Sequence, residues 1–264
     1  MRKLSSSSTT IYLMLPIYNE AASIAHVIEE IRRALWGYRY RIIALDDGST
    51  DRTPHILKDL TEKKKDVVTL RTPVNMGIGA VFSVGISYVL GVSKSGEDIL
   101  IIMESDQTST TSTIRQLSAR VGSGFDVVIA SRYCPGGGYG NFPLGRRLFS
   151  YSANILMRLF FPLPKVADYT IFFRGYRVGI LKRAGEVYGR FGLIQSKGFV
   201  ANAELLVKLA LVGARIGEIP FVYDYGKKQG GSKLSIVQTV NEYIVTLLYL
   251  RQVRGKVSAL ARRS

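Results

Sequence analysis

The sequence is poor in the residues that mark several classes of protein. Among 264 residues there is one cysteine, Cys134, so an internal disulfide and a multi-cysteine zinc site are excluded. A small disulfide-stabilised secreted scaffold is therefore ruled out, and we expect a reducing compartment. Only two histidines occur, His26 and His55, and we interpret both as packed or solvated helix residues rather than catalytic ones.

Long apolar runs are also missing. A membrane-spanning helix needs ~18–20 apolar residues, and the longest candidate, residues 236–250, is interrupted by Gln238, Asn241 and Glu242. Residues 1–10 contain two basic residues followed by serines and threonines, and the apolar run after them is short. We expect residues 1–10 to be a disordered tail rather than a signal peptide.

Acidic residues are scarce relative to basic ones, with 20 Asp and Glu against 36 Lys and Arg, and the net charge is +16. Such a charge favours an anionic partner, which could be nucleic acid, anionic lipid or a phosphorylated substrate. No recognised nucleic-acid motif accompanies the charge, so we expect no nucleic-acid partner. The 47% hydrophobic and 21% charged content is that of an ordinary globular protein.

The first 130 residues alternate short apolar runs with amphipathic stretches, which predicts an α/β protein with a mostly parallel central sheet flanked by helices. We expect strands at 11–15, 40–45, 67–70, 98–103 and 126–130, and helices at 20–35, 51–64 and 77–90. The second half is expected to hold a Pro/Gly-rich loop at 134–143, a basic helix at 144–160, an aromatic strand at 171–176, a helix at 202–211 and a strand at 215–222.

The C-terminal stretch has the pattern of a basic amphipathic helix, which we place at residues 234–264. Val240, Ile244 and Leu247 recur at helical spacing, and basic residues follow them. Such a helix lies in a membrane interface or packs on the domain with a solvated basic end. Residues 11–233 are then expected to form a single domain.

Polar residues follow the first two expected strands, at the end where open α/β sheets bind their ligands. The first strand runs into Tyr18, Asn19 and Glu20, which indicates either a helix start with Asn19 as N-cap or a binding site. The second runs into Asp46 and Asp47. Adjacent carboxylates in this position suit hydrogen bonds to a base or ribose.

Glycines and acids mark the next two strand ends. Gly77 and Gly79 begin a helix, where backbone N–H groups attract phosphate and where glycines also ease helix packing. The pair is neither a Walker loop nor the full dinucleotide fingerprint. Glu104 and Asp106 point to the same side of their strand, because strand side chains alternate. Two carboxylates so placed can hold Mg²⁺ or Mn²⁺.

These segments, in this order and spacing, resemble the family 2 glycosyltransferases with the GT-A fold over nearly the whole chain. Later motifs are similar to those of polyprenyl-phosphate sugar synthases such as dolichol-phosphate mannose synthase: Ser131-Arg132-Tyr133, Gly136-Gly137-Gly138, Arg146-Arg147 with Ser150, and Gly231-Ser232-Lys233. The resemblance implies an inverting enzyme that moves mannose or glucose from a nucleotide diphosphate sugar, GDP-mannose or a UDP-hexose, to a polyprenyl phosphate.

The resemblance also implies a role for each matching residue. The residues implied to bind the nucleotide are Pro16, Tyr18, Glu20, Asp46, Asp47, Gly77, Gly79 and Ser105. Glu104 and Asp106 would hold Mg²⁺ or Mn²⁺ on the diphosphate. The implied catalytic residues are Asp106, Arg132, Arg146, Ser150 and Lys233. Of these, the two arginines and Ser150 would bind the acceptor phosphate, and Lys233 belongs to a late loop that closes over the site.

The chain departs from the family pattern at several positions. Glu104 replaces the usual aspartate, Thr108 stands where a glutamine is common, Lys227 replaces an arginine, and Ile171-Phe172 replaces a Ser-Gly pair. The departures at Glu104 and Thr108 suggest, as one alternative, a catalytically silent module that binds sugar nucleotides.

The acceptor decides what chemistry the chain must supply. A phosphate monoester has a second pKa of about 6, so a polyprenyl phosphate is already a charged nucleophile and needs no strong base. The alternative acceptor is a saccharide or protein hydroxyl, which would need a carboxylate base such as Asp168 or Glu204. A lipid acceptor implies peripheral contact with the cytoplasmic face of a membrane, with a membrane-anchoring subunit as a possible partner.

Overall fold

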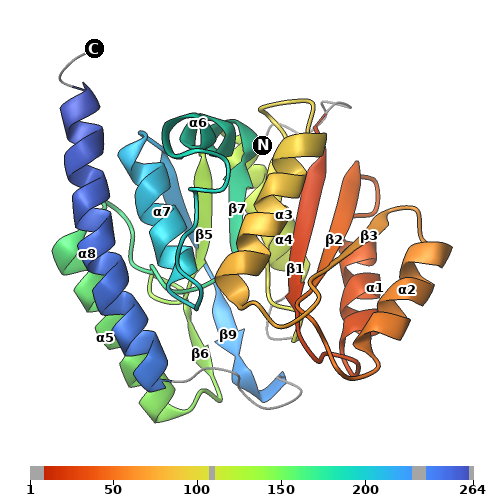
Figure 1. The fold of residues 1–264 in the computed structure, drawn as a ribbon. Helices are drawn as coiled ribbons and strands as arrows, with labels where there is room; N and C mark the ends of the chain where they lie inside the picture. Colours follow the sequence, from red (N-terminus) through yellow and green to blue (C-terminus); the bar gives the residue numbers. More distant parts are fainter. Residues whose placement is uncertain (1–8, 107–110, 228–235, 262–264) are drawn as a thin grey trace.

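The computed structural model describes residues 9–106, 111–227 and 236–261. Seven strands form one sheet in the order β3-β2-β1-β4-β7-β5-β8 (Figure 1). They are β1 (Ile11–Ile17), β2 (Tyr40–Asp46), β3 (Val67–Arg71), β4 (Ile99–Ile102), β5 (Val127–Ser131), β7 (Arg174–Arg177) and β8 (Ile216–Pro220). All pairings are parallel except those of β7, which runs antiparallel to β4 and β5. The predicted α/β class with a mostly parallel sheet is confirmed.

Helices cover both faces of the sheet (Figure 1). One face carries α1 (Ile24–Ala34), α2 (Thr53–Lys63) and α4 (Thr111–Gly122), and the other carries α3 (Ile78–Val92), α6 (Val178–Tyr188) and α7 (Ala201–Leu211). Helix α1 buries Ile24, Val27, Ile28 and Ile31, which recur at helical spacing and so share its inner face.

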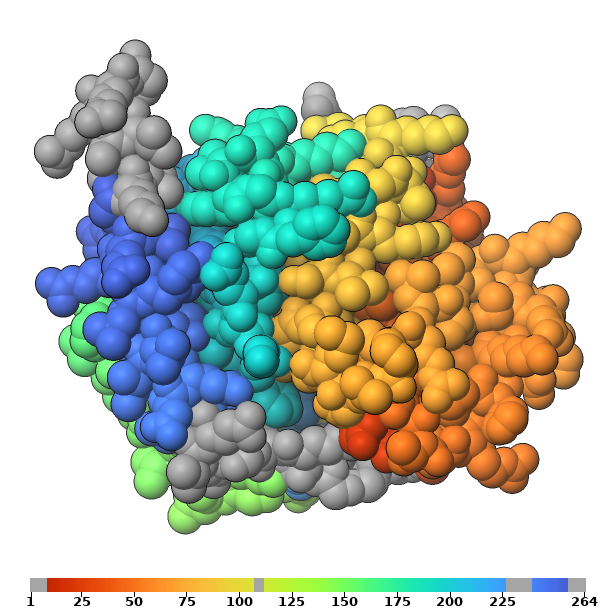
Figure 2. Space-filling model, in the orientation of Figure 1, coloured from red at the N-terminus to blue at the C-terminus, as the bar shows by residue number. Residues whose placement is uncertain are grey.

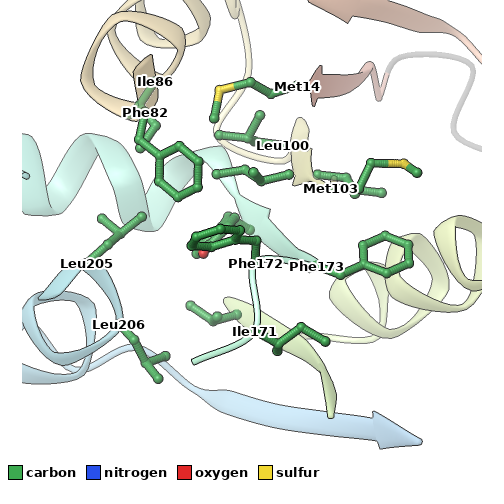
Figure 3. Packing of buried hydrophobic residues seen from close by; sticks show 14 of the residues in the cluster. Met14, Phe82, Ile86, Leu100, Met103, Ile171, Phe172, Phe173, Leu205 and Leu206 are labelled. Atoms are coloured by element: carbon green, nitrogen blue, oxygen red, sulfur yellow. The ribbon is translucent and has the colours of Figure 1, made fainter. Parts of the chain in front are cut away.

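The core is continuous from the sheet into α3 and α7, as Figure 3 shows around Phe82, Phe172 and Leu205. The α3 side of this core depends on a small residue at position 85. A Cβ atom at Gly85 would lie 2.1 Å from Met14 Sδ and 2.5 Å from Leu45 Cδ1, so a larger residue would require these side chains to move or α3 to lie farther from β1. The ring of Phe172 meets that of Phe82 edge-on at 5.4 Å and stacks on Phe199 at 5.5 Å.

The predicted aromatic strand at 171–176 was wrong in its boundaries, because β7 begins only at Arg174. The reason lies in Asp168, whose Oδ1 accepts hydrogen bonds from the backbone N–H groups of Thr170 and Ile171, both at 3.1 Å. These bonds turn the chain before it can join the sheet. Three further features were missed: helix α4, helix α6, and a two-stranded parallel sheet of β6 (Gly138–Gly140) with β9 (Val222–Asp224), whose strands are only three residues long.

Helices α5 (Leu144–Phe160) and α8 (Ile236–Ala261) lie side by side at one edge of the molecule (Figure 1). Helix α8 also packs against α7, and it forms the surface along this edge, with α5 visible beside it in Figure 2. Within the described ranges, no helix is both long enough and apolar enough to cross a bilayer. Most of the expected N-terminal tail, residues 1–8, falls outside them, while the backbone N–H of Thr10 donates to Asp98.

Candidate active site

A cavity of about 670 Å³ lies where β1, β2 and β4 end and extends to α5 and α8. The predicted site residues that line it are Pro16, Tyr18, Glu20, Asp47, Gly77, Glu104, Ser105, Asp106, Arg132, Arg146 and Ser150. Asp46 and Gly79 do not reach its wall. Lys233 and Thr108 lie outside the described residues. Residues from both halves of the chain are thus brought to one site.

The β1 and β2 ends are tied together through Asn19. Its backbone N–H donates to Ser49 Oγ at 2.9 Å, and its Oδ1 accepts from the backbone N–H of Thr50 at 2.8 Å. Asn19 has a positive φ of 53°, and α1 begins four residues beyond Glu20, so Asn19 is not the helix N-cap. Its role is to hold the loop that presents Tyr18 and Glu20 to the cavity.

The two aspartates after β2 have different positions. Asp47 lines the cavity, and its two oxygens accept from the backbone N–H groups of Met76, at 2.8 Å, and Gly77, at 2.9 Å. Asp46 is buried behind it, where it accepts from the backbone N–H of Ser49 at 2.9 Å and forms an ion pair with Arg71. Asp46 therefore shapes the turn, and Asp47 anchors the start of α3 at the cavity wall.

The glycines before α3 serve close packing as well as the cavity. The backbone N–H of Gly79 donates to Lys197 O at 2.9 Å, and a Cβ atom at Gly79 would lie only 1.7 Å from Ser196 O. Gly77 lines the cavity with a φ of +88°, a conformation that favours glycine. Gly79 therefore serves close packing, because it lies against the backbone of Ser196 and Lys197.

The β4 end delivers carboxylates to the same wall. Ser105 secures this segment, because its hydroxyl donates to Pro16 O at 2.8 Å and its carbonyl accepts from Ser23 Oγ at 3.1 Å. On either side of it, Glu104 is half-buried and Asp106 is buried, and both line the cavity. The described residues contain no group of three or more His, Cys, Asp or Glu side chains arranged to hold a metal.

The second half of the chain contributes arginines to the cavity wall. Arg132 is buried and forms a two-pronged ion pair with Asp168, in which Nε and Nη2 donate to the two carboxylate oxygens at 2.7 Å each. Burial opposes both charges, but the mutual attraction outweighs it, so the pKa of Asp168 is lowered and the pKa of Arg132 is raised. Arg132 therefore remains charged at the cavity wall.

A cluster of hydroxyl groups surrounds this arginine. Ser150 Oγ lies 3.0 Å from Tyr133 Oη, 3.3 Å from Tyr139 Oη and 3.1 Å from Thr170 Oγ1. Arg132 also donates to Thr170 at 2.6 Å and lies over the rings of both tyrosines. Burial raises the pKa of Tyr139, so it stays a neutral phenol. The predicted pair of Arg132 and Ser150 is thus part of one connected network.

Asp168 and Glu204, the two carboxylates considered as bases for a hydroxyl acceptor, do not line the cavity. Asp168 is fully buried against Arg132. Glu204 is also fully buried, where it forms an ion pair with Lys208 at 2.6 Å and accepts from the backbone N–H of Ser196 at 2.8 Å. Both side chains are committed to structural contacts.

Several wall residues were missed by the reasoning from sequence. They are Lys197 and Phe199, from the segment before α7, and Thr239, Glu242 and Tyr243, from α8. No local motif marks them, because they reach the cavity only through the packing of α7 and α8. Ile171 and Phe172 also line it, so the departure from the family pattern noted at these positions enlarges the apolar part of the wall.

The mostly parallel sheet, with carboxylates at its strand ends and arginines lining the same cavity, is the arrangement of a GT-A fold. The chain belongs to glycosyl transferase family 2, whose model matches residues 12–185. It is 28% identical over 252 residues to a dolichol-phosphate mannosyltransferase of Pyrococcus furiosus. The aligned region includes 96% of the chain but 66% of the Pyrococcus protein, just under two thirds of that protein's length.

Two other likenesses agree. A polyprenol monophosphomannose synthase of Mycolicibacterium smegmatis is 26% identical over 84% of the chain and 80% of its own length. Among solved structures, a glucosyl-3-phosphoglycerate synthase from Mycobacterium tuberculosis, in complex with Mn²⁺, UDP and phosphoglyceric acid, superposes with a TM-score of 0.65 at 20% identity. The superposition includes 92% of the chain and 79% of the synthase, and at this sequence identity it supports the fold alone.

Proposed function

We propose that the protein transfers mannose or glucose from a nucleotide diphosphate sugar to a polyprenyl phosphate. The observation that carries the proposal is one cavity whose wall includes three carboxylates and two arginines: Asp47, Glu104, Asp106, Arg132 and Arg146. Such a division suits two anionic substrates, one bound through a metal ion and one bound through arginines. The names of the Pyrococcus and Mycolicibacterium relatives support a lipid phosphate as acceptor.

The donor binds at the strand ends of the first half. Tyr18 and Glu20 line the cavity beside Asp47, and together they offer a ring and carboxylate oxygens to a base and ribose. Gly77 brings the start of α3 to the same wall, where the positive end of the helix dipole favours a diphosphate. The nucleotide is GDP or UDP, as in the GDP-mannose and UDP-hexose donors that the resemblance implies.

Glu104 and Asp106 fit a divalent ion. Both are carboxylates at one wall, and Mg²⁺ and Mn²⁺ accept oxygen ligands while sharing their site with substrate phosphates, so two protein ligands suffice. A bound ion would stabilise the negative charge that builds up on the departing nucleoside diphosphate.

The acceptor phosphate binds at Arg132, Arg146 and Ser150. Arg132 is held in place by Asp168, while Arg146 is half-buried with its guanidinium over the ring of Tyr225 at 5.7 Å. The planar guanidinium of Arg146 suits paired hydrogen bonds to phosphate oxygens, whereas Arg132, whose Nε and Nη2 donate to Asp168, offers its remaining N–H groups. Both positive charges offset the repulsion between the two substrates. Direct attack by the phosphate oxygen breaks the bond between the anomeric carbon and the nucleotide and inverts the configuration there.

A hydroxyl acceptor is the second candidate, and one residue favours it. Glu242 of α8 lines the cavity and is the carboxylate there that could take a proton from a saccharide or protein hydroxyl. Asp168 and Glu204 are excluded from that role, because both are fully buried in ion pairs.

A lipid acceptor also places the protein at a membrane. We propose peripheral contact with the cytoplasmic face, in keeping with the single cysteine and the net charge of +16. A membrane-anchoring subunit is the alternative means of attachment.

The proposal is tested by a transfer assay with Mn²⁺ or Mg²⁺, labelled GDP-mannose and UDP-glucose, and a short polyprenyl phosphate. We expect labelled product in the organic phase from one donor. Asp106→Asn should lower the rate by on the order of 100-fold, because it removes charge that holds the leaving group. Asp59→Asn is the matched control, since Asp59 is exposed on α2 and away from the cavity.

Other outcomes assign other functions. Product on a saccharide or peptide, lost in Glu242→Gln, would favour the hydroxyl acceptor. Donor binding without any transfer would identify a silent sugar-nucleotide-binding module. If neither nucleotide sugar binds, the proposed activity is refuted.

A further inference from the structure

A second cavity, of about 730 Å³, lies at the β8 edge of the sheet. Its wall is formed by the end of α4, the loop after β5, the end of α5 with the loop that follows it, and strand β8. Among the described residues, none lines both this cavity and the candidate active site. Sites for small molecules occupy roughly 300–1,000 Å³, so the second cavity is large enough for a ligand of its own.

The charged side chains of this wall are mostly cations. Four of them line it, Arg120, Arg158, Lys165 and Arg215, against one acid, Glu218. Within the part of the chain that the structure describes, none of the four cations forms an ion pair. Like charges gathered around one cavity repel one another, and a bound anion would offset that repulsion.

The acids near the cavity are engaged elsewhere. Glu218 Oε1 accepts hydrogen bonds from two backbone N–H groups, at 2.8 and 2.9 Å, and burial raises the pKa of its carboxyl group. Asp126, which does not line the cavity, accepts from the backbone N–H of Arg215 at 2.8 Å and forms an ion pair with Arg177 at 3.5 Å. The positive charges of the wall therefore remain available to a ligand.

Two of the arginines are held in place by one aromatic ring. The guanidinium groups of Arg120 and Arg215 lie over the ring of Phe125, at 4.3 and 4.6 Å from its centroid. The ring itself is seated on β8, because a Cβ atom at Gly217 would lie only 2.7 Å from a ring carbon. Such contacts restrict both side chains before a ligand arrives, so less conformational entropy is lost on binding.

We propose that this cavity binds a small ligand that carries two or more phosphate groups. Several cations around one cavity match a chain of phosphates better than a single one, and guanidinium groups donate paired hydrogen bonds to phosphate oxygens. The inference goes beyond the proposed function and does not depend on it, since the second cavity shares no described wall residue with the candidate active site.

The chain carries its own reporter of this cavity, because its one cysteine, Cys134, lines the wall. The probes are inorganic pyrophosphate and UDP, with EDTA present so that no divalent ion holds either probe at Glu104 and Asp106. At about ten times its Kd, a bound probe should slow the reaction of Cys134 with a neutral maleimide about tenfold, because only the unoccupied fraction reacts. Sodium chloride of equal ionic strength should change the rate by less than about twofold.

The two probes distinguish the sources of the ligand. Protection by pyrophosphate that is equal to or stronger than protection by UDP identifies the phosphate chain alone as the ligand. Stronger protection by UDP identifies a nucleotide, whose nucleoside also contacts the wall.

Two double variants test the cations of the wall. Arg120→Gln with Arg215→Gln should raise the Kd of the protecting probe at least about tenfold, because charge-assisted hydrogen bonds are lost. Arg158→Gln with Lys165→Gln should raise it by a similar factor and leaves the ring contacts of Phe125 in place. All four side chains are exposed, and melting temperatures check that each variant is folded.

The matched control is Arg183→Gln with Arg251→Gln, which removes the same charge from exposed helix arginines that line neither cavity. Its Kd should stay within about twofold of the wild-type value. Three results would overturn the inference: no protection of Cys134 by either probe, an equal rise of Kd in the control, and protection that Arg146→Ala abolishes while the wall variants keep it. None of these measurements uses transfer activity, so they can be read whether or not the proposed function is right.

Discussion

Asp168 shows how a single buried side chain can set up a binding site that it does not enter. It is fully buried, and its carboxylate holds the guanidinium of Arg132 at 2.7 Å while also turning the backbone at Thr170 and Ile171. Removing one partner of a buried ion pair leaves the other charge uncompensated. Asp168 is therefore a positioning residue for Arg132.

We predict that Asp168→Asn lowers the free energy of unfolding by about 3–5 kcal/mol. In the wild-type chain the pKa of Asp168 lies below its usual 3.8, so its stabilisation is present above that pH and is lost as the pH falls through the lowered value. Urea unfolding between neutral and acid pH measures both effects. In Asp168→Asn, the free energy of unfolding should no longer show the fall at acid pH that protonation of Asp168 causes. The control is Glu62→Gln, which removes an exposed ion pair with Lys58 and should change the free energy of unfolding by less than about 1 kcal/mol.

The same variant separates positioning from general stability. At a temperature where Asp168→Asn is folded, its KM for the acceptor should rise while donor affinity stays near that of the wild type, because Asp47 and the strand ends are untouched. Equal losses of acceptor and donor binding would show a purely structural role.

Asp47 is a positioning residue on the donor side of the cavity, as Asp168 is on the acceptor side. Its carboxylate accepts from the backbone N–H groups of Met76 and Gly77, and hydrogen bonds to charged groups contribute about 1.5–3 kcal/mol each. We predict that Asp47→Ala weakens GDP or UDP binding at least about tenfold in isothermal titration. Asp59→Asn should bind as the wild type does, and unchanged binding by Asp47→Ala would contradict the assignment.

At the scale of the element, α3 is placed by its glycines. Gly85 lets the helix approach β1, and Gly79 lies against the backbone of Ser196 and Lys197. The start of α3 therefore packs between the sheet and the segment before α7. The cavity wall at Gly77 depends on this position.

We predict opposite effects of alanine at two helical glycines. Gly79→Ala should destabilise the protein and reduce nucleotide binding, because its Cβ would overlap Ser196 O at 1.7 Å. Gly185→Ala, in α6, has nothing within 4 Å of the added atom and should stabilise the protein by about 0.5–1 kcal/mol. Thermal unfolding measures both, and a gain of stability in Gly79→Ala would show that the contact relaxes.

At the scale of the whole molecule, the cavity joins parts that are far apart in the sequence. Tyr18, Asp106, Arg146 and Glu242 come from four separate regions, so a ligand that binds there links them. Ligands that bind only the folded state raise its stability in proportion to the logarithm of their concentration.

We predict that GDP or UDP with Mn²⁺ raises the melting temperature, and that EDTA removes most of the rise. At a hundredfold excess over Kd the gain is about 2.7 kcal/mol. Asp106→Asn should show the nucleotide effect without the extra contribution of Mn²⁺. A rise that is equal with and without metal would contradict the metal role of Glu104 and Asp106.

Most of the first half could be predicted from the sequence. Apolar runs such as 11–15 and 40–45 predicted buried parallel strands, and the polar residues after them marked the cavity edge, because the carboxyl ends of parallel strands meet at one edge of a sheet. The family 2 motifs predicted the pairing of that edge with Arg132, Arg146 and Ser150.

Only the tertiary structure decided the rest. Hydrophobic periodicity depends on neighbours along the chain, so it could not predict that Asp168 would bend the 168–173 segment, that Asp46 would be buried behind Asp47, or that Glu242 would reach the cavity. It also marked the apolar residues of α5 and α8 without showing which would be buried. That choice depends on how the two helices pack on the domain, and this packing leaves apolar side chains of both helices, such as Leu144 and Leu248, in solvent.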